Sequence, residues 1–432
     1  MKRVLLVLGV LLLLLLGFCS CAGEAETEGE TAEDVAVNTQ GEDWTVNTQE
    51  DDSKEVNSPN EESGTIMTEK ANILRIKNGA KAVISLTHDD GNLATVQFMN
   101  ERFLENGLCG TVGLMGKNFA SLEGRIYVST VAKWAPFFES GVFEVANHSW
   151  SHSFVGITDE GDTGVVLYSN VNKSQITDEN ATIPAGNLTK EIIKSREALI
   201  SCFPNEKVLI YIKAGTPGYK DENGTFIQLS PEALEMVSDN HIAMRLTTGG
   251  LSGAALVENF PFEDAYSLHS LQVSPKHTAK EWKDYVDMAI EKGGWMTYLF
   301  HNIVEDDKAT GISVGKTNAA ALFDYVGEKV ASGDVWCAKY SEAVRYSEEY
   351  KSARGVVNTC ADKIEVTLTD ELPNMWYDYP LTVLLKLPMD WETVQITYGD
   401  GTVETLSTFV DGEDRMVYAN IVPDSGTAVI TK

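Results

Sequence analysis

The chain has 432 residues and a formal net charge of −30, and hydrophobic residues make up 43% of it. At about one domain per 150 residues, this length predicts two or three domains with a globular bulk. The acidic balance disfavours nucleic acid and other polyanions as partners, whereas a neutral or cationic polymer is compatible with it.

The first 21 residues have the pattern of an export signal. Lys2 and Arg3 precede an apolar run over residues 4–18, which is shorter than the roughly 20 residues of a membrane-spanning helix. Ser20-Cys21 resembles the lipobox of bacterial lipoproteins. We therefore expect a lipoprotein signal peptide over residues 1–21, a lipid on Cys21, and a location in the cell envelope, anchored to a membrane outside the cytoplasm. An ordinary secretory signal with incidental cysteines is the alternative.

An acidic segment follows the signal. Residues 22–64 carry fourteen acidic side chains against one base, Lys54. Such a segment cannot bury apolar surface, so residues 22–70 are predicted to be a disordered linker.

The remaining cysteines show neither metal-binding spacing nor a compact disulfide framework. We expect mostly buried thiols at these positions, which are Cys109, Cys202, Cys337 and Cys360.

From residue 79 onward, short apolar runs alternate with amphipathic stretches. Strands are predicted over residues 82–86, 111–114, 142–146, 208–212, 242–246 and 296–300, and helices over 93–106, 131–140, 188–203, 231–238, 279–292 and 319–332. Repeated strand–helix units predict an α/β domain over residues 71–352, with a parallel sheet that is open or closed into a barrel. Residues 154–186 are rich in polar residues and glycine, which predicts a loop insertion beside the site.

Helical periodicity stops after about residue 352. Alternating apolar positions and the turn at Asp400-Gly401 predict a small β-sandwich domain over residues 360–432. Its aromatic residues Trp376, Tyr377 and Tyr379 are compatible with sugar binding, but core or inter-domain packing is the more common role.

Candidate catalytic residues follow three of the predicted strands, where the chemistry of parallel sheets gathers. Asp89 and Asp90 follow the first strand, and one carboxylate can bind a metal while its neighbour accepts a proton. His148 and His152, four residues apart, can face one side of a helical turn and share one ion with Asp90. His301 follows a later strand and can donate a proton. Each feature alone is more often an inert turn or a packed histidine.

Together, Thr87-His88-Asp89-Asp90-Gly91, His148-Ser149-x-x-His152 and Leu299-x-His301 resemble motifs of the polysaccharide deacetylases of carbohydrate esterase family 4. The resemblance spans about residues 79–350. It implies a distorted (β/α) barrel, and an enzyme that removes N- or O-linked acetyl groups from an extracytoplasmic polysaccharide or oligosaccharide.

Roles follow from the resemblance position by position. Asp90, His148 and His152 would bind a divalent metal, most often Zn²⁺, with Co²⁺, Ni²⁺ or Mn²⁺ as alternatives. Asp89 would be the general base and His301 the general acid.

The chain departs from the family pattern at its third motif, where residues 213–219 (KAGTPGY) lack the usual arginine. Lys213 or Arg245 would then orient Asp89, and the backbone donor for the oxyanion would fall at Gly218 or Tyr219. His88 replaces the usual phenylalanine of the first motif.

Two other functions remain open. A glycan-binding surface lipoprotein with the same fold would need neither Asp89 nor His301, and both are present. A metallopeptidase is the second, but the sequence has no His-Glu-x-x-His helix to support it.

Overall fold

The computed structural model divides the chain into residues 1–62 and residues 63–432. The residues that it describes are 67–155, 166–168, 188–215, 219–220, 226–227, 229, 231–248 and 250–432. The predicted signal peptide, Cys21 and nearly all of the predicted linker lie outside this set, as does most of the predicted loop insertion at 154–186. Within the described ranges, no helix combines the length and hydropathy needed to span a bilayer.

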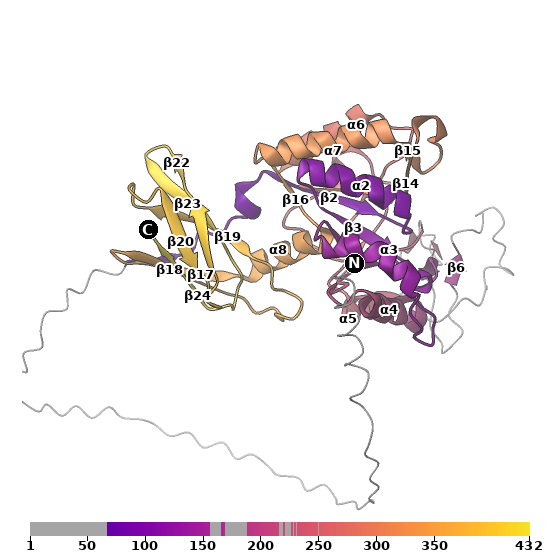
Figure 1. Ribbon diagram of the computed structural model, residues 1–432, viewed down its shortest axis with the longest axis horizontal. Coiled ribbons are helices and arrows are strands. Elements are labelled where there is room, and N and C mark those ends of the chain that lie inside the picture. Colours follow the sequence, from indigo (N-terminus) through magenta and orange to yellow (C-terminus); the bar gives the residue numbers. More distant parts are fainter. Residues whose placement is uncertain are drawn as a thin grey trace, which may run out of the picture. The chain divides into compact units, whose positions relative to one another are not determined.

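A mainly parallel sheet carries the site (Figure 1). Its strands, in spatial order, are β10 (Ala243–Arg245), β7 (Ile210–Ile212), β4 (Phe143–Asn147), β3 (Gly110–Leu114), β2 (Ala82–His88), β13 (Trp295–Phe300) and β11 (Val257–Glu258). β12 (Leu271–Gln272) also pairs with β13, and β16 (Val335–Cys337) with β2. A parallel bridge between Arg245 and Leu268 joins β10 to the segment before β12. The strands therefore curl into a ring, and the predicted distorted (β/α) barrel is confirmed.

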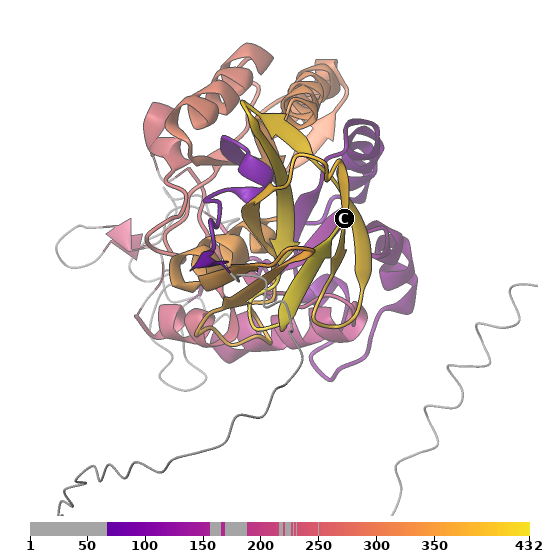
Figure 2. The ribbon, with the colours of Figure 1, turned by 90° about the vertical axis from the view of Figure 1, so that its left-hand side faces the viewer.

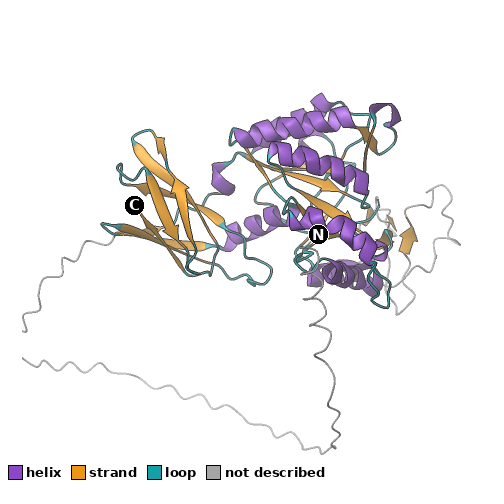
Figure 3. Cartoon of the chain, viewed as in Figure 1, coloured by secondary structure: helices purple, strands orange, loops and turns teal. Residues whose placement is uncertain are grey.

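Amphipathic helices cover the outside of this sheet, as Figure 3 shows. They are α2 (Leu93–Asn106), α3 (Val128–Glu139), α4 (Ser195–Cys202), α5 (Pro231–Asn240), α6 (Ala279–Lys292), α7 (Lys316–Ala331) and α8 (Tyr340–Ser352), with a π-helical turn, η5 (Thr189–Lys194), before α4. The predicted bounds of α2 and α6 are confirmed. Both have clear end signals, because Asn92 caps α2, a Thr278–Glu281 capping box starts α6, and both helices end at a left-handed glycine.

Short two-stranded sheets lie in the connecting segments. They are β5 (Ser153–Val155) with β6 (Val166–Tyr168), β8 (Tyr219–Lys220) with β9 (Phe226–Ile227), and β14 (Asn302–Val304) with β15 (Ser313–Gly315).

The C-terminal part consists of antiparallel strands, drawn in yellow in Figure 2. One sheet has the order β1 (Met67–Lys70), β17 (Arg354–Thr359), β18 (Lys363–Thr369), β24 (Thr427–Thr431), β20 (Thr393–Thr397) and β21 (Val403–Ser407), and the other has β19 (Leu381–Leu387), β23 (Asp414–Ile421) and β22 (Phe409–Asp411). Alternate residues of these strands share one buried apolar cluster, as expected for the predicted sandwich.

This sheet begins earlier than the sequence suggested. β17 starts at Arg354, and residues 67–70, assigned to the linker from their polar composition, form the edge strand β1 beside β17. All four side chains of β1 are exposed, so the strand has no apolar pattern. It is held by its backbone pairing and by a hydrogen bond from Thr68 Oγ1 to Asn358 Oδ1 at 2.8 Å.

Tyr379 packs between the two parts of the fold. Its side chain is buried, and its ring stacks on Trp336 of β16 at 5.9 Å. Its backbone N–H donates to Glu349 of α8 at 2.9 Å. The packing role expected for this aromatic residue is therefore confirmed.

Candidate active site

Two adjacent carboxylates point in different directions from the turn after β2. Asp90 (φ 69°) and Gly91 (φ 67°) both adopt the left-handed conformation, which reverses the chain immediately before α2. The Asp89 side chain is 3% exposed and the Asp90 side chain 40%. The Asn92 N–H donates to His88 Nε2 at 2.8 Å and closes the turn. One carboxylate is thus buried, while the other faces the surface of the site.

His148 and His152 follow β4 in a loop. The expectation that they share a helical turn is wrong, because Ser149 and His152 both have a φ of 64° and no helix forms. The His152 N–H donates to Ser149 Oγ at 2.9 Å, which tightens the loop. The two rings nevertheless converge, with centroids 4.8 Å apart.

Glu191, in η5, supports this loop from behind. Its fully buried carboxylate accepts hydrogen bonds from Ser151 N at 2.9 Å and from Ser151 Oγ at 2.8 Å. Its backbone carbonyl accepts from Trp150 N at 3.0 Å. Sequence reasoning missed this residue, since a single glutamate in an amphipathic helix carries no signal of such a role.

Asp90, His148 and His152 bring together one ligand atom each, all within 4.8 Å of one another. Asp90 Oδ1 lies 3.3 Å from His148 Nε2 and 3.2 Å from His152 Nε2. In the part of the chain that the structure describes, this is the one group of three or more such side chains with metal-binding geometry. Two imidazoles and a carboxylate are a common donor set for Zn²⁺ and similar divalent metals.

His148 is oriented for metal binding. Its Nδ1 lies 3.0 Å from the Ile212 carbonyl, which fixes the tautomer with the proton on Nδ1 and leaves the Nε2 lone pair facing Asp90. His148 Nε2 and Asp90 Oδ1 are both buried and have no hydrogen-bond partner among the described residues. Buried polar atoms without partners are costly, so this pair fits a bound cation.

Asp89 is held by Arg245, the last residue of β10. Arg245 Nη2 donates to Asp89 Oδ1, and both side chains are buried. Arg245 Nη1 also donates to Ser270 Oγ at 3.3 Å. Of the two residues that the sequence offered, the structure brings Arg245 to Asp89, while Lys213 Nζ donates to the Ala214 carbonyl at 3.3 Å.

Glycine at position 113 leaves room for this arrangement. A Cβ atom there would lie 3.0 Å from the Ile212 side chain and 3.4 Å from both Asp89 Oδ1 and the His148 Cβ. Sequence reasoning did not single out this residue, although a glycine inside a buried strand often marks a close approach of this kind.

The charges of the site keep both carboxylates ionised. Burial raises the pKa of Asp89, but Arg245, His148 and His301 outweigh it, so the pKa lies below its ordinary value. Burial likewise opposes ionisation of Asp90, but its close contact with His148 and the nearby His152 and His301 reverse the effect and lower its pKa. Burial lowers the pKa of His152 to about 4, which favours the neutral imidazole that a metal requires.

His301 follows β13 and approaches the other carboxylate oxygen of Asp90 from the one that the loop histidines contact. Its Nε2 is 3.9 Å from Asp90 Oδ2, and its side chain is 13% exposed. Burial is the largest influence on its pKa and lowers it. The position predicted for a proton donor is thus beside the metal-binding group.

The oxyanion donors predicted at residues 218 and 219 are not placed. Gly218 lies outside the described residues, and only the backbone of Tyr219, in β8, is described. Their role stays a prediction.

Comparison with known proteins found one partial sequence match and several structural matches. The chain matches no protein-family model. A stretch of 140 residues, 32% of this chain, is 30% identical to the gellan lyase of a Bacillus species, and the chain covers only 6% of the length of that protein.

Solved structures of several esterases and deacetylases also match. A peptidoglycan deacetylase from Bacillus subtilis is 16% identical, with a TM-score of 0.30, over 62% of this chain and 94% of its own. A family 4 acetyl xylan esterase from Clostridium thermocellum, in complex with a cobalt ion, is 15% identical, with a TM-score of 0.33. The match covers 60% of this chain and 89% of the esterase. The chain resembles carbohydrate esterase family 4.

Not every such match is an active enzyme. A family 4 pseudoenzyme from Bacillus anthracis is 11% identical, with a TM-score of 0.32, over 61% of this chain and 65% of its own. The matches name the family that the three sequence motifs resemble, and at these identities and TM-scores they carry no argument about the activity of this chain.

Proposed function

We propose that this chain is a metal-dependent hydrolase that removes N- or O-linked acetyl groups from an extracytoplasmic polysaccharide. The observation that carries the proposal is the convergence of Asp90, His148 and His152 beside Asp89, which Arg245 keeps ionised. A metal-binding group, a buried anionic base and a histidine proton donor are the parts that hydrolysis of an acetyl amide or ester requires.

Each residue of the site has a chemical task in this proposal. Asp90, His148 and His152 would hold a divalent metal, which would supply a Lewis acid for the acetyl carbonyl. Asp89 accepts a proton from the attacking water, and Arg245 holds its carboxylate in place. His301 donates a proton to the departing amine or alkoxide, so that acetate and a free amino or hydroxyl group are released.

The geometry favours a metal that accepts nitrogen and oxygen ligands together. Zn²⁺ suits two imidazoles and one carboxylate with a position left open, and Co²⁺, Ni²⁺ and Mn²⁺ accept the same donors.

We further propose that a lipid on Cys21 anchors the protein to a membrane outside the cytoplasm. The support is the sequence pattern of residues 1–21 and the acidic segment that follows it. Metabolic labelling with a fatty acid would test this, since Cys21→Ser should abolish label incorporation.

Acetate release tests the activity. The full chain, loaded with Zn²⁺, is incubated with acetylated chitooligosaccharides, acetylated xylan and peptidoglycan, and acetate is measured. Release from at least one substrate, with loss after chelation and recovery on metal addition, is expected. If the metal-loaded protein binds these glycans but releases no acetate, the chain is a glycan-binding protein and not a hydrolase.

A further inference from the structure

Cys109 and Cys337 meet where two strands follow one another along the same edge of β2. β13 occupies one edge of β2, so β16 and β3 share the other. Cys337, the last residue of β16, is opposite Ile84, and Thr111 of β3 is opposite Thr87. Cys109 lies two residues before Thr111, so its register differs from that of Cys337 by about one residue, or roughly 3.3 Å along the strand.

The contacts between the two cysteines are reciprocal. Cys109 Sγ lies 3.5 Å from the Cys337 carbonyl oxygen, and Cys337 Sγ lies 3.5 Å from the Cys109 carbonyl oxygen. Two side chains that each contact the backbone of the other are close neighbours, which is the first condition for a disulfide.

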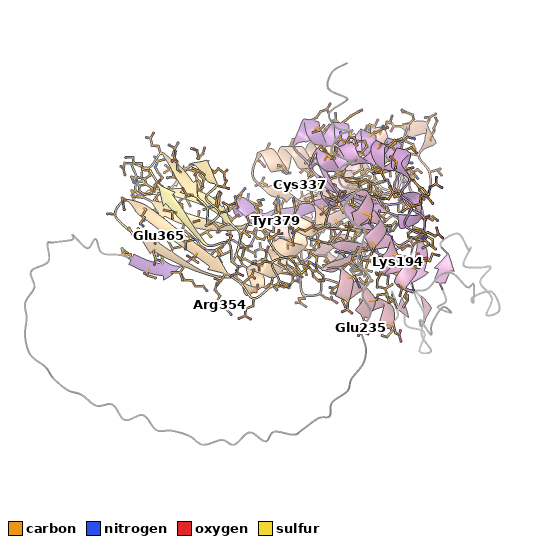
Figure 4. The ribbon with its side chains drawn as sticks, turned by 60° about the horizontal axis from the view of Figure 1, so that its bottom comes forward. Lys194, Glu235, Cys337, Arg354, Glu365 and Tyr379 are labelled. Carbon is orange, nitrogen blue, oxygen red and sulfur yellow. The ribbon has the colours of Figure 1, made fainter. Side chains whose placement is uncertain are left out.

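Both cysteines are partly exposed, in contrast to buried Cys202. Cys337 is labelled in Figure 4, in the same region of the molecule as Tyr379.

We propose that Cys109 and Cys337 are oxidised to an intramolecular disulfide. Both S–H bonds break and one Sγ–Sγ bond forms. The two electrons and two protons pass to an external disulfide, such as oxidised glutathione, which is reduced to two thiols.

The disulfide would fasten a junction that hydrogen bonds already define. The Tyr340 N–H donates to Thr111 Oγ1 at 2.8 Å, and the Ser341 N–H donates to Glu144 Oε1 at 2.9 Å. These bonds tie the start of α8 to β3 and β4. A covalent link between residues 228 positions apart would add to them, because it restricts the unfolded chain most when the closed loop is long.

The reaction should be slow at neutral pH. The hydrogen bond with Cys337, together with burial, raises the pKa of the Cys109 thiol well above its ordinary value. Since the thiolate is the reactive form, oxidation should accelerate as the pH rises.

The test uses the full chain, fully reduced and then exposed to oxidised glutathione at pH 8.5. After alkylation under denaturing conditions, peptide mass mapping should show a cross-linked peptide pair that contains Cys109 and Cys337, lighter than the reduced pair by two hydrogen atoms, or about 2 Da. The oxidised protein should also unfold at a temperature several degrees higher than the reduced protein.

Matched serine variants locate the bond. Cys109→Ser and Cys337→Ser should each abolish the cross-linked pair and the rise in unfolding temperature, whereas Cys202→Ser and Cys360→Ser should keep both. The proposal is overturned if Cys109 and Cys337 remain alkylated, if they carry only glutathione adducts, or if the bond joins other cysteines. None of these outcomes depends on hydrolysis, so the result is independent of the proposed activity.

Discussion

Arg245 at the end of β10 donates a buried hydrogen bond to Asp89 after β2, although 156 positions separate the two residues in the chain. The contact places a fixed positive charge beside the proposed base and lowers the pKa of Asp89. The motif resemblance predicts the arginine in residues 213–219, which follow β7. The structure instead supplies it from the end of β10.

Replacing this arginine should impair turnover and spare metal binding. In Arg245→Gln we expect kcat to fall by about 100-fold, because Asp89 loses both its orientation and its charge partner. The dissociation constant for Zn²⁺ should change little, since the side-chain hydrogen bonds of Arg245 among the described residues go to Asp89 and Ser270 and not to the three proposed ligands.

Arg345→Gln is the matched control, because Arg345 lies on α8, outside the site, and pairs with Asp378. It should keep wild-type kcat. If Arg245→Gln and Arg345→Gln lower kcat equally, Arg245 has no special relation to the base.

A side chain at Gly91 should disturb the turn that holds Asp89 and Asp90. It has a φ of 67°, and a Cβ atom there would lie 3.0 Å from Leu114 Cδ2. Gly91→Ala should therefore shift the Asp89–Asp90 turn and lower activity at least about tenfold. The variant should also lose roughly 1–2 kcal/mol of stability, because alanine is strained in this backbone conformation.

Gly107 offers the comparison, since its φ is 64° and nothing lies within 4 Å of the added Cβ. Gly107→Ala should lose a similar amount of stability, measured by urea unfolding, and retain activity. Equal activity in the two alanine variants would contradict a positioning role for Gly91.

Glu349 should make the stability of the fold depend on pH. Its side chain is fully buried, Oε1 accepts from Tyr379 N, and Oε2 has no partner among the described residues. Burial raises the pKa of Glu349 from 4.5 to about 8. Between these two values the folded protein holds a proton that the unfolded chain releases, so this group contributes less stability as pH rises.

Glu349→Gln removes the charge and keeps an acceptor for Tyr379. The variant should be more stable than wild type at pH 9, by a difference on the order of 1–3 kcal/mol, and the difference should shrink toward pH 5. Thermal unfolding across this range measures it, with the exposed Glu371→Gln as control. A difference that does not change with pH would show that Glu349 does not titrate as stated.

The sequence predicted the order of strands and helices because apolar periodicity follows burial directly, as in β2 and α2. It also placed Asp89, Asp90, His148 and His301 after strands, and in a parallel sheet those positions converge at one edge. The resemblance to deacetylase motifs then assigned chemistry to them.

Other features have no local signal. Non-glycine residues such as Ser149 and His152 adopt a positive φ only because the surrounding loop requires it, so a helical turn was expected. The choice of Arg245 over Lys213 depends on which strand ends meet across the ring. Strand β1 was missed because its four side chains are all exposed and show no apolar alternation.

The central claim is that one aspartate binds the metal and its neighbour acts as the base. The most direct measurement is bound Zn²⁺ and acetate release in parallel for wild type, Asp89→Asn and Asp90→Asn, since asparagine also adopts the left-handed conformation of residue 90. Asp89→Asn should keep its metal and lose acetate release, whereas Asp90→Asn should lose both. An Asp90→Asn protein that retains full metal, or an Asp89→Asn protein that still turns over at the wild-type rate, would contradict this assignment.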